Sequence, residues 1–139
     1  MIKEAYNGRR GGLLLEEGRP IFFTHKRREA EWYAYNRGDF NKPPIVTTVS
    51  LEISNPADYQ DLMKAVKETE VGAEDIQKHS SYEGNDVVGY LYVPEVRSKL
   101  IYDDFDSFEG WHIFTNTEIM ITAVFDPACI TVKEQEQIQ

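Results

Sequence analysis

The chain has 139 residues, of which 41% are hydrophobic and 12% are aromatic, and this composition predicts one folded globular domain and excludes a disordered tail. No apolar run approaches the roughly 20 residues that cross a bilayer, and no secretory-type segment opens the chain. The net charge of −9 is divided unevenly, with +3 in residues 1–42 and −12 in residues 43–139. We expect the acidic part to repel nucleic acid, whereas the basic part could hold an anion or form a solvated basic surface.

The first half of the chain predicts two strands, a helix and a third strand. Residues 5–10 form a first strand that glycines end, and residues 21–24 form a short aromatic strand after a turn. Residues 25–37 form a helix with Thr24 as a candidate N-cap and Gly38 as its stop. Alternation over residues 45–53 predicts a long, half-buried strand. The helix places one set of small, aromatic and basic residues against the sheet: Ala30, Tyr33, Ala34 and Arg37.

The second half predicts helices first and then strands. Asn55-Pro56 is typical of a helix start, and residues 73–78 predict a second short helix. Residues 80–110 are acidic, aromatic and turn-rich, with a possible strand at 87–93. Further strands are expected at residues 111–114, 119–126 and 130–132, followed by a frayed tail at 133–139. The order predicts a single α+β domain over residues 1–132 with a mostly antiparallel sheet.

The histidines and the cysteine do not predict a metal site or a nucleophile. His25, His79, His112 and Cys129 lack ligand spacing, so no metal is expected. Cys129 follows a turn near an acidic stretch, which raises the pKa of a thiol, and we expect a structural cysteine. One cysteine excludes an internal disulfide and suits a reducing compartment, so we expect a cytoplasmic protein.

Glu118 opens the most apolar strand of the chain. Residues 119–126 are almost wholly apolar and β-favouring, which predicts a strand buried on both faces. A carboxylate entering such a strand is expected to be rigid and partly desolvated, as a catalytic acid requires. The alternative is a solvated glutamate at a strand end. Residues 8–12, Gly-Arg-Arg-Gly-Gly, do not form a P-loop, and they could either cradle a phosphate or form a flexible turn.

Several short motifs together are more informative than any of them alone. They are, in order, Tyr6-Asn7-Gly8-Arg9, then Phe22-Phe23-Thr24 with Ala30, Tyr33 and Ala34, then Asn55-Pro56, and then Glu118 with Phe125-Asp126-Pro127 and Ile130. This order resembles the ADP-ribosyltransferase fold, particularly small bacterial and phage-borne members of the diphtheria-toxin-like and polyvalent-protein type. The resemblance covers residues 5–131. It implies two small, mostly antiparallel sheets with a few helices around an NAD cleft, and the host cytoplasm for a phage-encoded chain.

The resemblance also implies a chemistry and roles for particular residues. Such enzymes break the nicotinamide–ribose bond of NAD, and a carboxylate stabilises the oxocarbenium-like cation. Glu118 matches the catalytic glutamate, and Thr24 matches the hydroxyl that orients that glutamate or the ribose. Cofactor-binding positions are matched by Tyr6, Gly8, Arg9, Phe23 and Tyr33; Tyr33 could stack on nicotinamide or simply pack in the core. The implied partners are NAD and a macromolecular acceptor, expected to be a protein, with no membrane and no nucleic acid.

Two positions depart from the family pattern. Asn7 stands where members place histidine or arginine before the glycine, and Asn116 stands where arginine-directed transferases have glutamate or glutamine. Two hypotheses follow. The first is a mono-ADP-ribosyltransferase. The second is an inactive acidic inhibitor on the same scaffold, which mimics nucleic acid with carboxylates of residues 95–109. A third hypothesis is another α+β enzyme or a structural domain. The acceptor and the oligomeric state are left open.

Overall fold

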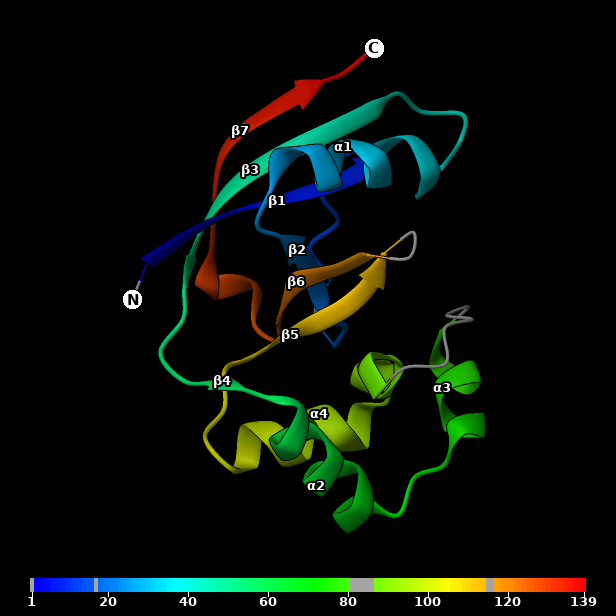
Figure 1. Ribbon diagram of the computed structural model, residues 1–139, viewed down its shortest axis with the longest axis vertical. Coiled ribbons are helices and arrows are strands. Elements are labelled where there is room, and N and C mark those ends of the chain that lie inside the picture. The colour runs from blue at the N-terminus through cyan, green and yellow to red at the C-terminus, as the bar shows by residue number, and fades with distance from the viewer. Residues whose placement is uncertain (1, 17, 81–86, 115–116) are drawn as a thin grey trace.

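A single mixed β-sheet forms the centre of the protein (Figure 1). The computed structural model describes residues 2–16, 18–80, 87–114 and 117–139. Seven strands pair in the order β4-β5-β6-β2-β1-β3-β7, and every pairing is antiparallel except that of β4 with β5. The α+β class and the mostly antiparallel sheet are therefore confirmed.

The expectation of two separate sheets is wrong, because hydrogen bonding is continuous across all seven strands. The shortest pairing in the sheet joins β1 (Ile2–Arg10) to β2 (Ile21–Thr24). It consists of one pair of Cα partners, Tyr6 and Thr24. On one side of this contact lie β3 (Pro44–Glu52) and β7 (Ile130–Gln137), and on the other lie β6 (Thr117–Val124), β5 (Ser107–Phe114) and β4 (Pro56–Ala57).

Helix α1 (Arg27–Asn36) packs directly on β1 and β3, as Figure 1 shows. The expected inner face is confirmed for Ala30 and Ala34, which are fully buried with Val46 of β3, whereas Arg37 is exposed at the C-cap. Small residues let the helix backbone approach the strand closely, and the approach is closest at Gly8, which has no Cβ. The N-cap is Lys26 and not Thr24, and Gly38 follows the helix in a left-handed conformation with φ +99°.

Three helices and one 3₁₀ segment cluster at the other end of the sheet, below β5 in Figure 1. Helix α2 does not start at Asn55-Pro56, since Pro56 belongs to β4 and a capping box of Asp58 and Asp61 starts the helix. The expected strand at residues 87–93 is wrong as well, because this segment is 3₁₀-helical. The elements are α2 (Tyr59–Thr69), α3 (Ala73–His79), η1 (Val87–Tyr92) and α4 (Pro94–Tyr102).

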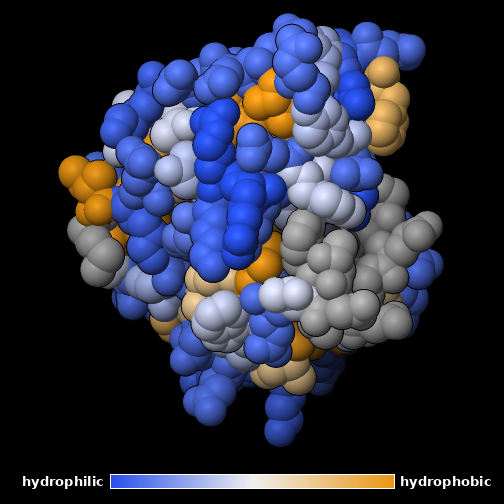
Figure 2. Space-filling view, turned by 45° about the horizontal axis from the view of Figure 1, so that its top comes forward, coloured by the Kyte–Doolittle hydropathy of each residue, from blue (hydrophilic) through white to orange (hydrophobic). Residues whose placement is uncertain are grey.

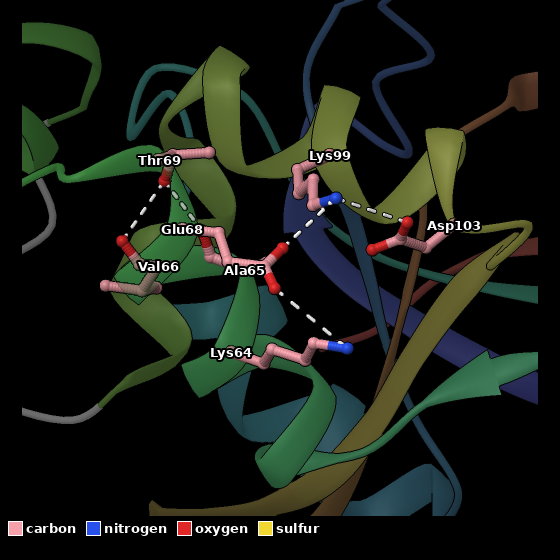
Figure 3. Close-up of polar contacts among 7 residues, drawn as sticks. All are labelled: Lys64, Ala65, Val66, Glu68, Thr69, Lys99 and Asp103. Carbon is pink, nitrogen blue, oxygen red and sulfur yellow. Dashed lines mark hydrogen bonds and ion pairs between the residues drawn. The ribbon is translucent and has the colours of Figure 1, made fainter.

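A small charge network joins α2 to α4 (Figure 3). The Glu68 carboxylate lies 3.1 Å from Lys99 Nζ and 4.0 Å from Lys64 Nζ, and Lys99 also lies 3.3 Å from Asp103. The apolar contacts beneath the network are those of Leu62, Val96 and Leu100, which are buried in the largest core cluster. Since the charges are partly exposed, apolar burial contributes most to this helix pair.

The C-terminal segment is longer and more ordered than expected. Strand β7 continues to Gln137 where a frayed tail was expected, because its backbone pairs with β3 from Ile45 to Leu51. Its side chains from Thr131 to Gln137 are exposed, so the sequence there has no apolar alternation. Within the described residues, no helix has the length and the apolar character needed to span a membrane. On the face drawn in Figure 2, hydrophobic residues occupy small separate areas among hydrophilic ones.

Candidate functional site

A cavity of about 380 Å³ opens beside the contact of β1 with β2, and it brings together most of the residues singled out in the sequence. Its volume lies within the range of small-molecule sites, roughly 300–1,000 Å³. Residues far apart in the sequence form its walls: the end of β1, the connection 11–20, β2, α1, η1 and one residue each of β5 and β6. The sequence-predicted residues that line it are Tyr6, Gly8, Arg9, Phe23, Thr24 and Tyr33.

Thr24 is held by the strand ends that meet at the cavity. Its Oγ1 lies 3.4 Å from the Tyr6 carbonyl oxygen and 3.3 Å from that of Lys26, and the residue is only 5% exposed. One hydroxyl hydrogen serves two carbonyl oxygens, so the side chain joins β1 to the start of α1. In this arrangement the Thr24 hydroxyl is engaged with the backbone.

Gly8 has a packing role that the sequence did not reveal. A Cβ at this position would lie 1.6 Å from the carbonyl oxygen of Ala30 and 2.8 Å from the backbone nitrogen of Ala34. Real Cβ atoms essentially never come within 3.0 Å of another heavy atom, so only glycine lets α1 sit at this distance from β1. The glycine of the Tyr-Asn-Gly-Arg motif is therefore explained by helix packing, whether or not a ligand contacts it.

Aromatic rings and guanidinium groups share the cavity walls. Tyr92 of η1 lies with its ring centroid 5.5 Å from that of Phe22, and burial raises the pKa of Tyr92 while Arg19 and Arg37 oppose the rise. The Arg37 guanidinium also lies 5.9 Å from the centre of the Tyr33 ring. A cationic, aromatic hollow in an acidic protein is suited to a ligand that combines a flat ring with negative charge.

Three of these lining residues were not predicted from the sequence. Arg37 had a usable signal, because it lies four positions after Tyr33 and so shares its helix face. Arg19 and Tyr92 had none, since each reaches the cavity only through the path of a connection or of the 3₁₀ segment. Long-range placement of this kind is set by tertiary packing.

Glu118 lies outside the cavity lining, on the hairpin of β5 and β6. It is the second residue of β6, pairs with Ile113, and has an exposed side chain, so the expected desolvation is wrong. The strand is buried only further along, from Ile119 onward. Successive strand residues alternate between faces, and Ile121 lines the cavity, so Glu118 is on the opposite face of β6. Asn116, the other position singled out on this hairpin, lies outside the described residues.

Among the described residues, one carboxylate lines the cavity, that of Glu16 in the connection 11–20. It lies 3.4 Å from Nη1 of Arg19, and both side chains are about half exposed. An exposed pair of this kind is weakly held, so Glu16 can exchange its partner for a ligand group at low cost.

The acidic stretch expected to mimic nucleic acid is largely engaged within the protein. Asp106 accepts hydrogen bonds from the backbone of Ser54 and Asn55, and Asp103 pairs with Lys99. The Glu109 carboxylate lies 2.8 Å from Lys3 Nζ. Carboxylates that are paired internally are poorly placed to imitate a row of phosphates.

The surroundings of Cys129 and His25 explain the direction in which the pKa of each side chain is shifted. The pKa of the Cys129 thiol is raised, first by burial and then by Asp126, Asp106 and Glu52, so the expected direction is confirmed. His25 Nε2 lies 2.8 Å from Thr122 Oγ1, and burial lowers the pKa of this histidine. Over the described ranges, no group of three His, Cys, Asp or Glu side chains is arranged to hold a metal ion.

Comparisons with known proteins give no family. No family model and no curated protein matches the chain. Two solved structures are similar over nearly its full length, both with a TM-score of 0.47. One is a chain of the M. tuberculosis MbcT–MbcA toxin–antitoxin complex, 9% identical, covering 100% of this chain and 85% of that one; the other is an anti-CRISPR protein, 14% identical, covering 98% and 96%. Similarity at this level carries no argument about function.

Proposed function

We propose that the protein binds NAD in the 380 Å³ cavity, breaks its nicotinamide–ribose bond, and transfers ADP-ribose to a macromolecular acceptor. One observation supports this most: six residues singled out from the sequence line one cavity, although they come from β1, β2 and α1. A hollow with Tyr33 and Phe22 on its walls and Arg9, Arg19 and Arg37 around them offers a ring surface and cationic groups to a dinucleotide. Phe23 is only 1% exposed, so its ring packs in the core.

The proposed reaction needs a carboxylate near the ribose. The glycosidic bond breaks with its electron pair leaving on nicotinamide, and the ribose becomes oxocarbenium-like. The acceptor then adds through a nucleophilic atom and loses its proton. A nearby carboxylate stabilises the cation and can accept a hydrogen bond from a ribose hydroxyl. The sequence pattern assigns this role to Glu118, while the cavity lining contains Glu16.

Nicotinamide release from NAD tests the proposal and separates the two carboxylates. The purified protein is assayed alone and with a bacterial lysate, beside Glu118→Gln and Glu16→Gln. Both side chains are exposed, so neither change should affect folding. Under the proposal, loss of the carboxylate that stabilises the cation lowers the rate by about a hundredfold or more, as loss of a stabilising charge in a transition state does. The other of the two variants keeps most of the rate.

The remaining outcomes are equally informative. Loss of release in Glu16→Gln alone would move the catalytic role to the connection 11–20. Dependence on lysate would indicate transfer to a macromolecule, and release without lysate would indicate hydrolysis by water. No release and no calorimetric NAD binding by the wild-type protein would refute the proposal and favour a binding module on this scaffold.

A further inference from the structure

Arg97 of α4 is a buried cation whose hydrogen bonds go to backbone carbonyls. It is 7% exposed, its Nη1 donates to the Leu91 carbonyl oxygen at 2.7 Å, and its Nη2 donates to the Gly18 carbonyl oxygen. In the part of the chain that the structure describes, it forms no ion pair with a carboxylate. Burial lowers the pKa of the Arg97 guanidinium, so this position carries a desolvation cost.

The two carbonyls belong to two different walls of the proposed ligand cavity. Gly18 lies in the connection 11–20, which contributes four lining residues: Leu14, Glu16, Arg19 and Pro20. Leu91 lies in η1, which contributes Val88 and Tyr92. One guanidinium group therefore fixes the distance between the connection and the 3₁₀ segment.

Arg97 does not line the cavity itself. It lies behind the wall, in a second hollow of about 220 Å³ that shares Arg19, Pro20 and Tyr92 with the first. At Gly18, where φ is +79°, an added Cβ would meet no atom within 4 Å, so side-chain packing does not anchor the connection there. The hydrogen bond that Arg97 donates to the Gly18 carbonyl oxygen is a contact that holds this point of the connection.

We propose that Arg97 is a positioning residue for the ligand cavity: it holds the connection 11–20 against η1 and so sets the place of Arg19 and Tyr92, without touching the ligand. The identity of the ligand rests on the proposed function, but the proposal that Arg97 holds the two walls together does not. Two kinds of measurement are therefore needed, one with NAD and one without.

The test compares Arg97→Met and Arg97→Lys with Leu100→Val. Methionine keeps the apolar stem and removes every donor, lysine keeps the charge and can reach one carbonyl, and Leu100 lies on the same helix in the apolar core. NAD affinity is measured by calorimetry, and mobility of the connection is measured as native-state thermolysin cleavage at Leu13–Leu15, where Leu14 and Leu15 are exposed.

The expected pattern distinguishes positioning from general stability. Arg97→Met weakens NAD binding about tenfold and speeds cleavage about tenfold, as the loss of one or two charge-assisted hydrogen bonds allows, and Arg97→Lys falls between it and the wild type. Leu100→Val lowers the melting temperature but changes neither value. Wild-type affinity and wild-type cleavage in Arg97→Met would overturn the proposal.

Failure of the proposed function would leave the second measurement intact. If the wild-type protein binds no NAD, the cleavage rates alone test the proposal. Equal cleavage rates in the wild type and in Arg97→Met would then overturn the proposal that Arg97 holds the connection 11–20 against η1. If Arg97→Met does not fold, Arg97→Lys is compared with the wild type in both assays, and unchanged values in both overturn it.

Discussion

The close approach of α1 to β1 predicts that Gly8→Ala is severely destabilising. The new Cβ would lie 1.6 Å from the Ala30 carbonyl oxygen, whereas ordinary contact begins at 3.4 Å, so the gap must widen by about 1.8 Å. The clashing atoms are helix backbone and cannot rotate away. Overpacking of a well-packed site costs about 1–3 kcal/mol, and we expect about 3 kcal/mol or more here. That is a large part of a typical domain stability of about 5–15 kcal/mol.

Urea unfolding followed by circular dichroism measures this loss, with Gly18→Ala as the control. Gly18 has a φ of +79° but open space around its Cα, so alanine there should cost only about 1 kcal/mol of backbone strain. Because α1 also places Tyr33 and Arg37 at the cavity, Gly8→Ala should, under the proposed function, weaken NAD binding as well. A Gly8→Ala protein within 1 kcal/mol of the wild type would refute the packing argument.

Three further predictions concern polar groups. Thr47 Oγ1 is fully buried without a hydrogen-bond partner among the described residues, so Thr47→Val should stabilise the protein by about 1 kcal/mol in urea unfolding, and a loss of stability would contradict this. Burial lowers the pKa of His25, so the folded state binds its proton less readily than the unfolded state, and stability should fall as pH decreases from about 7.5 through the usual histidine value near 6.5. His25→Gln should flatten this dependence, and an unchanged dependence would contradict the prediction. Glu68→Gln removes the partly exposed pairs with Lys64 and Lys99, and it should cost less than about 1 kcal/mol at low salt and close to nothing at 1 M salt.

Local patterns predicted the elements whose own residues decide their structure. The inner face of α1 followed from the spacing of Ala30 and Ala34, and β3 followed from strict alternation. Helix α4 was missed because it lies within residues 80–110, which as a whole are acidic, aromatic and turn-rich, although Pro94 at its first turn was a usable signal. Strand β7 was predicted only at its start, residues 130–132, since its exposed polar residues from Lys133 onward form a strand only through pairing with β3.

The residues of the candidate site were likewise predicted only where local sequence patterns decide their position. Short motifs located Tyr6, Thr24 and Tyr33, which the fold brings to one cavity. The environment of Glu118 was misjudged, because an apolar strand does not reveal where along it the hairpin end lies or which face its first residues take. Arg97 gave no signal at all, since the two carbonyls it binds are 6 and 79 positions away in the sequence.

The central claim is that NAD binds in the cavity between β1, β2, α1 and η1. Titration of the ¹⁵N-labelled protein with NAD, followed by heteronuclear NMR, tests it most directly. The account predicts shifts concentrated on the backbone amides of Tyr6, Arg9, Thr24, Tyr33 and Tyr92, with α2 and β7 unaffected. Saturating NAD that shifts no amide, or that shifts mainly the amides of α2 and β7, would contradict it.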